Sequence, residues 1–538
     1  MASTIPDPQP LDGPPGPPAQ ADSAPPSEPP AQPGSAAPAP PPAPADGPPP
    51  ADRPASPAAP TRHEPPASGR AGRIEAHGID PIPDAERRGR PRDLFAVWAA
   101  ANVNYLSLVI GGALVLMGLS LGQALGVLVV GNLFWLLTGF LATSGPAAGA
   151  PSEVITRAMY GVIGNRVNNA IGGWLVSVCY FALNLAAAAS AAFALVEMAG
   201  VTAGTGVKVA VIVAIAALTL AISVYGHATI MKLYLPITLV LASAFAVVAV
   251  AVVRRADFSH QPAEPLTGLD LWAVLIAGTA LTASGPLSYT TSADFSRYLP
   301  RTASRASITL WTALGAFVPS VAVSSLGVLA ATTVDMTDPQ SALQQILPGW
   351  FTPVFLLALV LGTVSINALT AYSAGLALQA VGLRVRRSVS VLLDGAVAVA
   401  LTLYGLLVSD FLDTVSNALQ VIVVLIGPLM AVYATDIALR RCRYDGAALA
   451  DESPRSPFWY SRGVNRAGAL AVTSGVVAAS LCVNTLYTGP VAAALGGVDL
   501  SLPAGMAVSA ALYAVLMRAD RGVRAARSPV TWRKKAGR

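Results

Sequence analysis

The stretch Leu281–Tyr298, LTASGPLSYTTSADFSRY, closes a long apolar segment and carries a Gly-Pro pair inside it. Pro286 lacks an amide hydrogen and clashes with the preceding helical turn, while Gly285 tolerates non-helical backbone. We therefore expect the helix to be interrupted at Ser284-Gly285-Pro286, which would free backbone groups to bind a polar ligand. A simple proline kink is the alternative.

An earlier apolar segment shows a similar feature. It holds Ile110-Gly111-Gly112 in its middle, preceded by Asn102, Asn104 and Tyr105. Such polar side chains must face protein or a cavity, although hydrogen bonding between packed helices would also explain them. Discontinuous helices at corresponding positions of two halves are typical of the binding sites of secondary transporters. We therefore predict helix breaks at Gly111-Gly112 and at Gly285.

The composition indicates a membrane protein. Apolar residues make up 54% of the 538 and charged residues 12%, against about 25% charged in soluble domains. Each crossing takes about 20 apolar residues, and the alternation typical of β-barrels is missing. We predict an all-α polytopic protein with twelve transmembrane helices. They lie at 95–118, 121–142, 171–198, 207–226, 229–253, 271–293, 308–332, 351–379, 389–409, 414–437, 466–487 and 501–517.

The arrangement of these segments predicts a five-plus-five-plus-two organisation. The first and sixth segments are both glycine-interrupted, and each opens a group of five. Because five is odd, the second group enters the membrane from the opposite side, which makes an inverted repeat. Substrate and ion sites then lie near the bilayer midplane, around the unwound backbone.

Basic residues predict the orientation, because cytoplasmic loops carry an excess of them. They concentrate in alternate connections and in the C-terminal tail, which places both termini in the cytoplasm. The basic connections hold Arg157 and Arg166; Arg297, Arg301 and Arg305; Arg384, Arg386 and Arg387; and Arg440, Arg441, Arg443, Arg455, Arg462 and Arg466. The opposite connections hold mainly Lys208, Arg254 and Arg255, with Asp335, Asp338, Asp410, Asp413 and Asp499.

The domain organisation follows from the composition along the chain. Residues 1–92 form a Pro/Ala-rich cytoplasmic tail, disordered over most of its length, with a charged lead-in; residues 93–517 form the transporter domain; 518–538 form a basic tail. The first part cannot bury enough apolar surface to offset the entropy of ordering. Runs such as Pro40-Pro41-Pro42 could bind a partner domain, although a plain spacer is favoured.

Two further segments carry candidate ligand-binding side chains. Tyr180 and Asn184 are four residues apart and share a helix face. An aromatic ring beside an amide suits a flat heterocycle, which the ring stacks on and the amide hydrogen-bonds. Asn367 is a second amide at mid-membrane depth, where it needs a partner. Packing and interhelical hydrogen bonding are the alternatives for both.

These residues carry a resemblance to a known family. Over about residues 85–517 the chain resembles the nucleobase–cation symporter family of cytosine/purine permeases and hydantoin transporters. Its most specific element is Asp294-Phe295-Ser296-Arg297-Tyr298, similar to the family's Asp-Phe-x-Arg-aromatic signature. The resemblance implies a leucine-transporter-like fold with twelve helices and import of nucleobases or related heterocycles, such as hydantoins and allantoin, coupled to sodium or protons.

The resemblance also implies a substrate site. The family's substrate-binding positions fall on Asn104, on Tyr180 and Asn184, on Ser284 and Gly285, and on Asn367. The family's stacking aromatic of the sixth segment is absent at Gly285, which allows a one-sided stack or a differently shaped substrate.

The implied cation site is incomplete. The family's backbone ligands for sodium fall on Ala100, Val103 and Ala358, but its side-chain ligands fall on Leu361 and Gly362, which have no side-chain oxygen. Sodium is a hard cation that prefers oxygen ligands, and Thr363 is the nearest substitute. A proton carrier is the alternative, with Glu197, Asp394 and Asp294 as titratable groups in or near the segments.

Other function classes lack support in the sequence. No catalytic pair or metal-ligand spacing emerges, and Cys179, Cys442 and Cys482 suggest buried apolar residues. A channel would need rings of carbonyls or charges. We therefore expect a cell-membrane importer without a cofactor beyond a coupling Na⁺ or H⁺, taking cytosine or a purine, with allantoin, hydantoin or a thiamine-like ring as alternatives. A non-transporting sensor or scaffold would keep the same fold.

Overall fold

The structure is a computed structural model that describes residues 74–75, 77–408, 411–485 and 487–527. The predicted Pro/Ala-rich tail up to residue 73 and the basic residues 528–538 lie outside this part. The tail's expected disorder and its possible partner therefore stay predictions. Asp410 of the predicted outer connections also lies outside the described residues.

All twelve predicted segments contain a helix. Nine described helices are long and apolar enough to cross a membrane, the bent pair α1–α2 makes a tenth, and the shorter apolar helices α12 and α20 complete the set. The first five are α1 (Asp93–Asn102) with α2 (Tyr105–Leu116); α3 (Leu121–Asn132) with α4 (Trp135–Ala142) and α5 (Ser144–Ala148); α8 (Val162–Asn168) with η3 (Asn169–Leu175) and α9 (Val176–Met198); α10 (Thr205–Tyr225); and α11 (His227–Val253). The others are α12 (Gly268–Ala283) with α13 (Thr291–Asp294), α14 (Arg305–Ala331), α16 (Thr352–Ala380), α17 (Arg387–Val408), α18 (Phe411–Arg440), α20 (Arg466–Cys482) and α22 (Ser501–Arg527).

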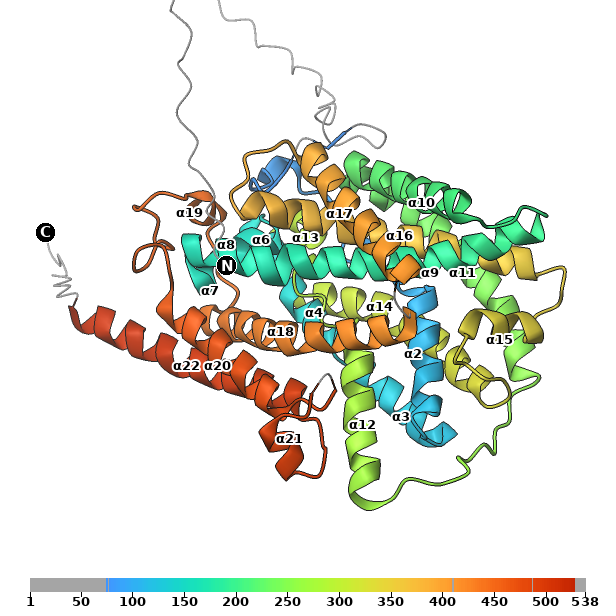
Figure 1. Cartoon of the computed structure of the whole chain (residues 1–538). Helices are drawn as coiled ribbons and strands as arrows, with labels where there is room; N and C mark the ends of the chain where they lie inside the picture. Colours follow the sequence, from blue (N-terminus) through green and yellow to red (C-terminus); the bar gives the residue numbers. More distant parts are fainter. Residues whose placement is uncertain (1–73, 76, 409–410, 486, 528–538) are drawn as a thin grey trace, which may run out of the picture. The chain divides into compact units, whose positions relative to one another are not determined.

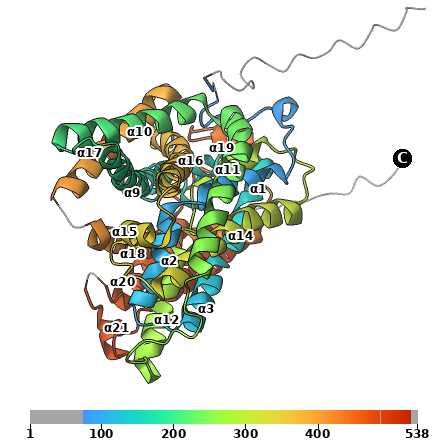
Figure 2. The same cartoon turned by 90° about the vertical axis from the view of Figure 1, so that its right-hand side faces the viewer.

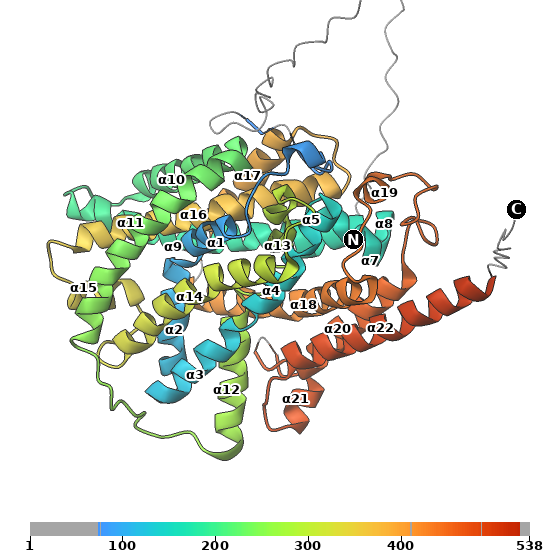
Figure 3. The same cartoon turned by 180° about the vertical axis from the view of Figure 1, so that it is seen from behind.

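The five-plus-five-plus-two organisation is visible in the packing. Corresponding members of the two groups lie against each other, α4 with α14, α9 with α16 and α10 with α17. Figure 1 shows α9 and α18 running side by side, while α2 and α12 extend away from them in a different direction. The last two long helices, α20 and α22, pack together on α18, outside the repeat (Figures 1 and 3). Figure 2 shows α10 and α17 together on one side.

The sixth segment is interrupted as predicted. α12 ends at Ala283, and helix resumes only at Thr291 in α13. Pro286 and Gly285 lie in the connecting turn. The predicted segment to residue 293 therefore consists of one long and one short helix, because the chain unwinds at the Gly-Pro pair rather than bending through it.

The break in the first segment lies elsewhere than predicted. Gly111 and Gly112 are inside the continuous helix α2, and the interruption falls at Val103 and Asn104, where the two halves are bent by 57°. Gly111 is needed for close packing instead: a Cβ there would lie 1.9 Å from the backbone oxygen of Ser324 in α14. The asparagines that precede the glycines, not the glycines themselves, mark the break.

The lead-in before α1 packs onto the helices. Glu75, Ile82 and Arg87 are all buried, and Arg87 donates to the backbone oxygens of Ile82 and Pro146 at 2.8 and 3.2 Å. This packing was not predictable from the sequence, because the stretch is short, charged and without an apolar run. It ties the start of the described chain to one end of the bundle.

We expect Gly111→Ala to destabilise the protein by about 1–3 kcal/mol, the usual cost of forcing a methyl group into a packed contact. Gly126→Ala is the matched control: it is also a helical glycine, in α3, but no atom lies within 4 Å of its added Cβ. That variant should gain about 0.5–1 kcal/mol from the better helix propensity of alanine. Thermal unfolding of the detergent-solubilised variants measures both, and equal effects would contradict the close α2–α14 contact.

Candidate binding site

A cavity of about 120 Å³ lies between the two broken segments. A single buried water needs about 10–15 Å³, so the space is large enough for a small ring molecule. Its walls come from α1 and α2, from α9, from the turn after α12, and from α14 and α16. Five of the six predicted substrate residues line it: Asn104, Tyr180, Asn184, Ser284 and Gly285.

Asn104 holds the break in the first segment open. It is the N-cap of α2, in extended conformation, and its Oδ1 accepts from the Ser107 amide at 3.0 Å. Its Nδ2 donates to the backbone oxygen of Ala101 at 2.7 Å, on the other side of the break. The side chain therefore satisfies backbone groups at both helix ends, as an N-cap asparagine does. One amide hydrogen stays available for a ligand.

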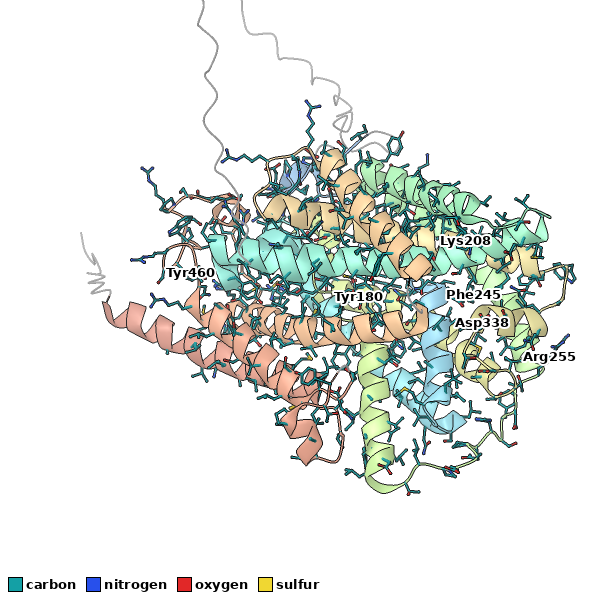
Figure 4. All side chains as sticks on the ribbon, in the orientation of Figure 1. Tyr180, Lys208, Phe245, Arg255, Asp338 and Tyr460 are labelled. Carbon is teal, nitrogen blue, oxygen red and sulfur yellow. The ribbon has the colours of Figure 1, made fainter. Side chains whose placement is uncertain are left out.

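Tyr180 connects α9 to the break in the sixth segment. Its hydroxyl donates to the backbone oxygen of Ser284 at 2.8 Å, and Figure 4 shows it in the interior of the bundle. The next two carbonyls are also bound: Gly285 accepts from the Ser288 hydroxyl at 2.9 Å and Pro286 from the Thr138 hydroxyl. Side-chain hydroxyls therefore replace the lost helical donors.

Asn184 differs from the other predicted residues because its amide nitrogen has no hydrogen-bond partner. The side chain is 3% exposed and lines the cavity, and its Nδ2 is buried without an acceptor. Most buried polar groups are paired, so an unpaired one requires a specific explanation. A ligand acceptor in the cavity would supply the missing bond.

Gly285 leaves one wall of the cavity bare. No atom lies within 4 Å of a Cβ added at this residue. A side chain here would therefore extend into open space, at the position where the resemblance implied a stacking aromatic. The open space at this wall therefore follows from the glycine at residue 285.

Asn367 lies behind the cavity and is not one of its lining residues. It is fully buried, and its Nδ2 donates to the backbone oxygen of Phe181 at 3.0 Å, which joins α16 to α9. Its Oδ1 has no partner. Its neighbours Ile366 and Thr370 do line the cavity.

The sequence interpretation missed an aromatic pair. Trp98 and Trp135 both line the cavity, with ring centroids 5.4 Å apart in an edge-to-face arrangement. Asn102 and Asn132 lie beside them and also line it. Trp98 precedes Asn102 by four residues, which places both on one helix face; this spacing could have revealed the first of the two rings.

The predicted sodium ligands do not form a complete set. Ala100, Val103 and Ala358 are buried at the contact of α16 with the first break, but a Cβ at Gly362 would lie 2.5 Å from the Val103 oxygen. Backbone therefore fills the place where a side-chain oxygen would stand. Leu361 packs among apolar side chains. With Thr363 alone as a possible side-chain donor, these residues do not fit a sodium ion.

The chain matches a known family and its relatives over most of its length. The family model described as "Permease for cytosine/purines, uracil, thiamine, allantoin" matches residues 81–505. The putative purine-cytosine permease YxlA of Bacillus subtilis (strain 168) is 28% identical over 461 residues, which cover 83% of this chain and 96% of that protein.

Solved structures agree in fold. Mhp1, a nucleobase-cation-symport-1 family transporter in a closed conformation with bromovinylhydantoin bound, superposes with a TM-score of 0.68 at 17% identity, over 83% of this chain and 96% of that one. Its inward-facing form gives 0.64 at 18% identity, over 84% and 96%. These likenesses confirm the leucine-transporter-like fold, and the chain belongs to the family of permeases for cytosine/purines, uracil, thiamine and allantoin.

Proposed function

We propose that the protein is a secondary active importer of a nucleobase or related small heterocycle, with cytosine or a purine as the first candidate. The family is one of permeases, so the chain is a transporter and not an enzyme. The unpaired amide of Asn184, facing a cavity between two broken helices, supports a substrate with a hydrogen-bond acceptor. A hydantoin is the second candidate, because Mhp1 carries a bromovinylhydantoin.

In this proposal a flat ring lies in the cavity against Tyr180. Asn184 donates to a ring oxygen or nitrogen, and Asn104 adds its remaining amide hydrogen. Ser284 and Gly285 form the neighbouring wall, where the unwound backbone leaves room beside the ring. Asn367 acts on the substrate from behind the cavity: its bond to the Phe181 oxygen holds α9, which carries Tyr180 and Asn184, in place.

Transport follows by alternating access. The first broken segment packs against α14 and the sixth against α3 and α4, while α9 and α16 pack closely against each other. Relative movement of these groups would open the cavity to one side and then to the other. Because the cavity touches both groups, a bound ring bridges them and favours the closed intermediate through which import proceeds.

We propose that the protein lies in the cell membrane with both termini in the cytoplasm. The arginine-bearing connections gather at one end of the bundle: Glu452 accepts from Arg157 and Arg166 at 2.5 and 3.0 Å, and a surface pocket there adds Arg384 and Arg387. A basic end of this kind faces the cytoplasm. In Figure 4, Tyr460 marks this end, and Arg255 and Asp338 lie at the opposite one.

A radiolabelled uptake panel tests the function, with cytosine, adenine, hypoxanthine, uracil, allantoin, hydantoin and thiamine offered to cells that overproduce the protein. We expect one of these compounds to be accumulated. Asn184→Ala should raise its KM about tenfold or more, because a hydrogen bond lost in a dry site costs about 1–3 kcal/mol. Asn367→Ala should also reduce uptake.

Ser190→Ala is the matched control for Asn184→Ala. It lies on the same helix, and its hydroxyl donates to the Ala186 oxygen at 3.1 Å. Its uptake should equal that of the wild type. If none of the seven compounds accumulates above the level in empty cells, the proposed function is wrong. If Asn184→Ala transports normally, the assigned donor is wrong.

A further inference from the structure

Two carboxyl groups lie side by side behind the cavity, and the site described above does not use them. Glu153 lies on the short helix α6 (Ser152–Ile155), between the second and third membrane helices, and Asp294 ends α13. Both are 0% exposed. Neither forms an ion pair with a Lys, Arg or His side chain among the described residues.

The two carboxyls differ in their hydrogen bonds. Asp294 accepts from the Ser152 amide at 3.0 Å and from the Ser373 hydroxyl of α16 at 2.5 Å. Neither carboxyl oxygen of Glu153 has a hydrogen-bond donor. An ionised carboxylate that is buried without donors is strongly disfavoured. The arrangement favours a protonated Glu153 that donates its hydrogen to Asp294.

The surrounding charges support one shared proton. Arg297 is the nearest cation, but its guanidinium group also lies 3.8 Å from the Glu75 carboxylate and donates to the Tyr372 hydroxyl at 2.9 Å. Burial and the neighbouring Asp294 raise the pKa of Glu153 well above its usual value. The other groups that face the pair are the phenols of Tyr289 and Tyr433. Two adjacent buried carboxyls cannot both ionise.

The pair is connected to the transport pathway on two sides. Tyr289, Thr290 and Thr291 line the cavity, and Asp294 follows three residues later on the same broken segment. Ser373, whose hydroxyl donates a hydrogen bond to the second carboxyl oxygen of Asp294, lies on α16. Protonation at this point therefore acts on the contact between the broken segment and α16, whose separation alternating access requires.

We propose that Glu153 and Asp294 together bind the coupling proton of this transporter. The inference rests on the import function proposed above. It also supplies a coupling cation for a chain in which the residues at the family's sodium positions do not form a complete set of ligands. One proton from water on the side of entry forms an O–H bond on the pair, and this protonated form then binds substrate. That bond breaks when the proton passes to water on the opposite side, so one proton and one substrate cross together.

Purified protein in sodium-free proteoliposomes tests the proposal, with radiolabelled cytosine and hypoxanthine as probes. With one proton per substrate, a gradient of one pH unit, acid outside, should drive about tenfold accumulation. Glu153→Gln should lose this accumulation but keep exchange of external for internal substrate, because glutamine has the shape of the protonated acid and cannot release a proton. Infrared spectra should show a protonated carboxyl band that disappears at alkaline pH in the wild type and is absent in Glu153→Gln.

Two other carboxyl variants serve as controls. Glu197→Gln changes an exposed carboxyl at the end of α9 and should accumulate substrate like the wild type. Asp394→Asn changes a second buried carboxyl, which accepts from the Trp174 indole, and it should keep proton-driven accumulation.

Several results would overturn the proton site. These are wild-type accumulation by Glu153→Gln, loss of coupling in Asp394→Asn alone, and accumulation by the wild type under a sodium gradient without a pH gradient. Failure of the wild type even to exchange either probe, together with a negative uptake panel, would instead refute the import function. The infrared band would still decide whether the pair holds a proton.

Discussion

Glu75→Ala is expected to destabilise the protein by about 3–5 kcal/mol, because it leaves two buried guanidinium groups without their shared anion. Glu75 lies 3.4 Å from Arg387 and 3.8 Å from Arg297, and all three side chains are 6% exposed or less. Its carboxylate also accepts from the His227 amide at 2.7 Å and the Tyr372 hydroxyl at 3.1 Å. Thermal unfolding in detergent, followed by tryptophan fluorescence, measures the loss.

Asp84→Ala is the control for Glu75→Ala. Asp84 lies in the same lead-in and contacts Arg87 and Arg301 at 3.1 Å each, but its side chain is 66% exposed. Exposed ion pairs contribute about 1 kcal/mol or less, so this variant should unfold close to the wild type. Equal losses in both variants would contradict the buried network around Glu75.

The same network should be insensitive to pH across the neutral range. Burial raises the pKa of Glu75, but the charges of Arg387 and Arg297 and the hydrogen bond from Tyr298 outweigh it, so the pKa lies below its usual value. A carboxyl whose pKa is lowered by folding contributes its stability above its unfolded pKa, about 4.3. That contribution is lost only as the pH falls through the folded value.

The helices of this protein were predictable because lipid imposes a simple length rule on apolar segments. The point of interruption in the first segment was not. Gly111 looks like a helix breaker in the sequence, yet a helix tolerates glycine where a neighbouring backbone approaches closely, as Ser324 does. Asn104 breaks the helix because its side chain caps the next one.

The residues that line the cavity were predictable in part, and for a physical reason. Polar side chains in an apolar segment must face protein or a cavity, which pointed to Asn104 and Asn184. The same reasoning could not distinguish Asn367 from these two residues, although Asn367 faces the Phe181 carbonyl instead of the cavity. A buried amide bound to a neighbouring helix and one facing a ligand look alike in sequence.

The buried charges could not be foreseen at all. Glu75 and Glu153 lie in short connecting stretches that read as solvent-exposed in the sequence. Each is buried by contacts with residues more than one hundred positions away: Glu75 with Arg297, and Glu153 with Asp294. No local pattern encodes such contacts, and only the folded chain brings them together.

Gly285→Trp is expected to reduce uptake more than about tenfold, which corresponds to about 1.4 kcal/mol in the binding or transport step. A side chain at this residue meets no atom within 4 Å and therefore extends into the cavity. Trp has one of the largest apolar side chains, and it would enter a space of only about 120 Å³. The substrate then loses its place between Tyr180 and the unwound backbone.

Gly285→Ala separates occupation of the cavity from damage to the fold. Its single methyl group enters the same open space, so uptake should stay near the wild-type level, and the unfolding temperatures of both variants should match the wild type. Uptake kinetics with the compound that the panel identifies give the comparison. Wild-type uptake or tighter binding in Gly285→Trp would contradict passage of the substrate beside this residue, because an indole cannot share so small a space with a ring that needs it.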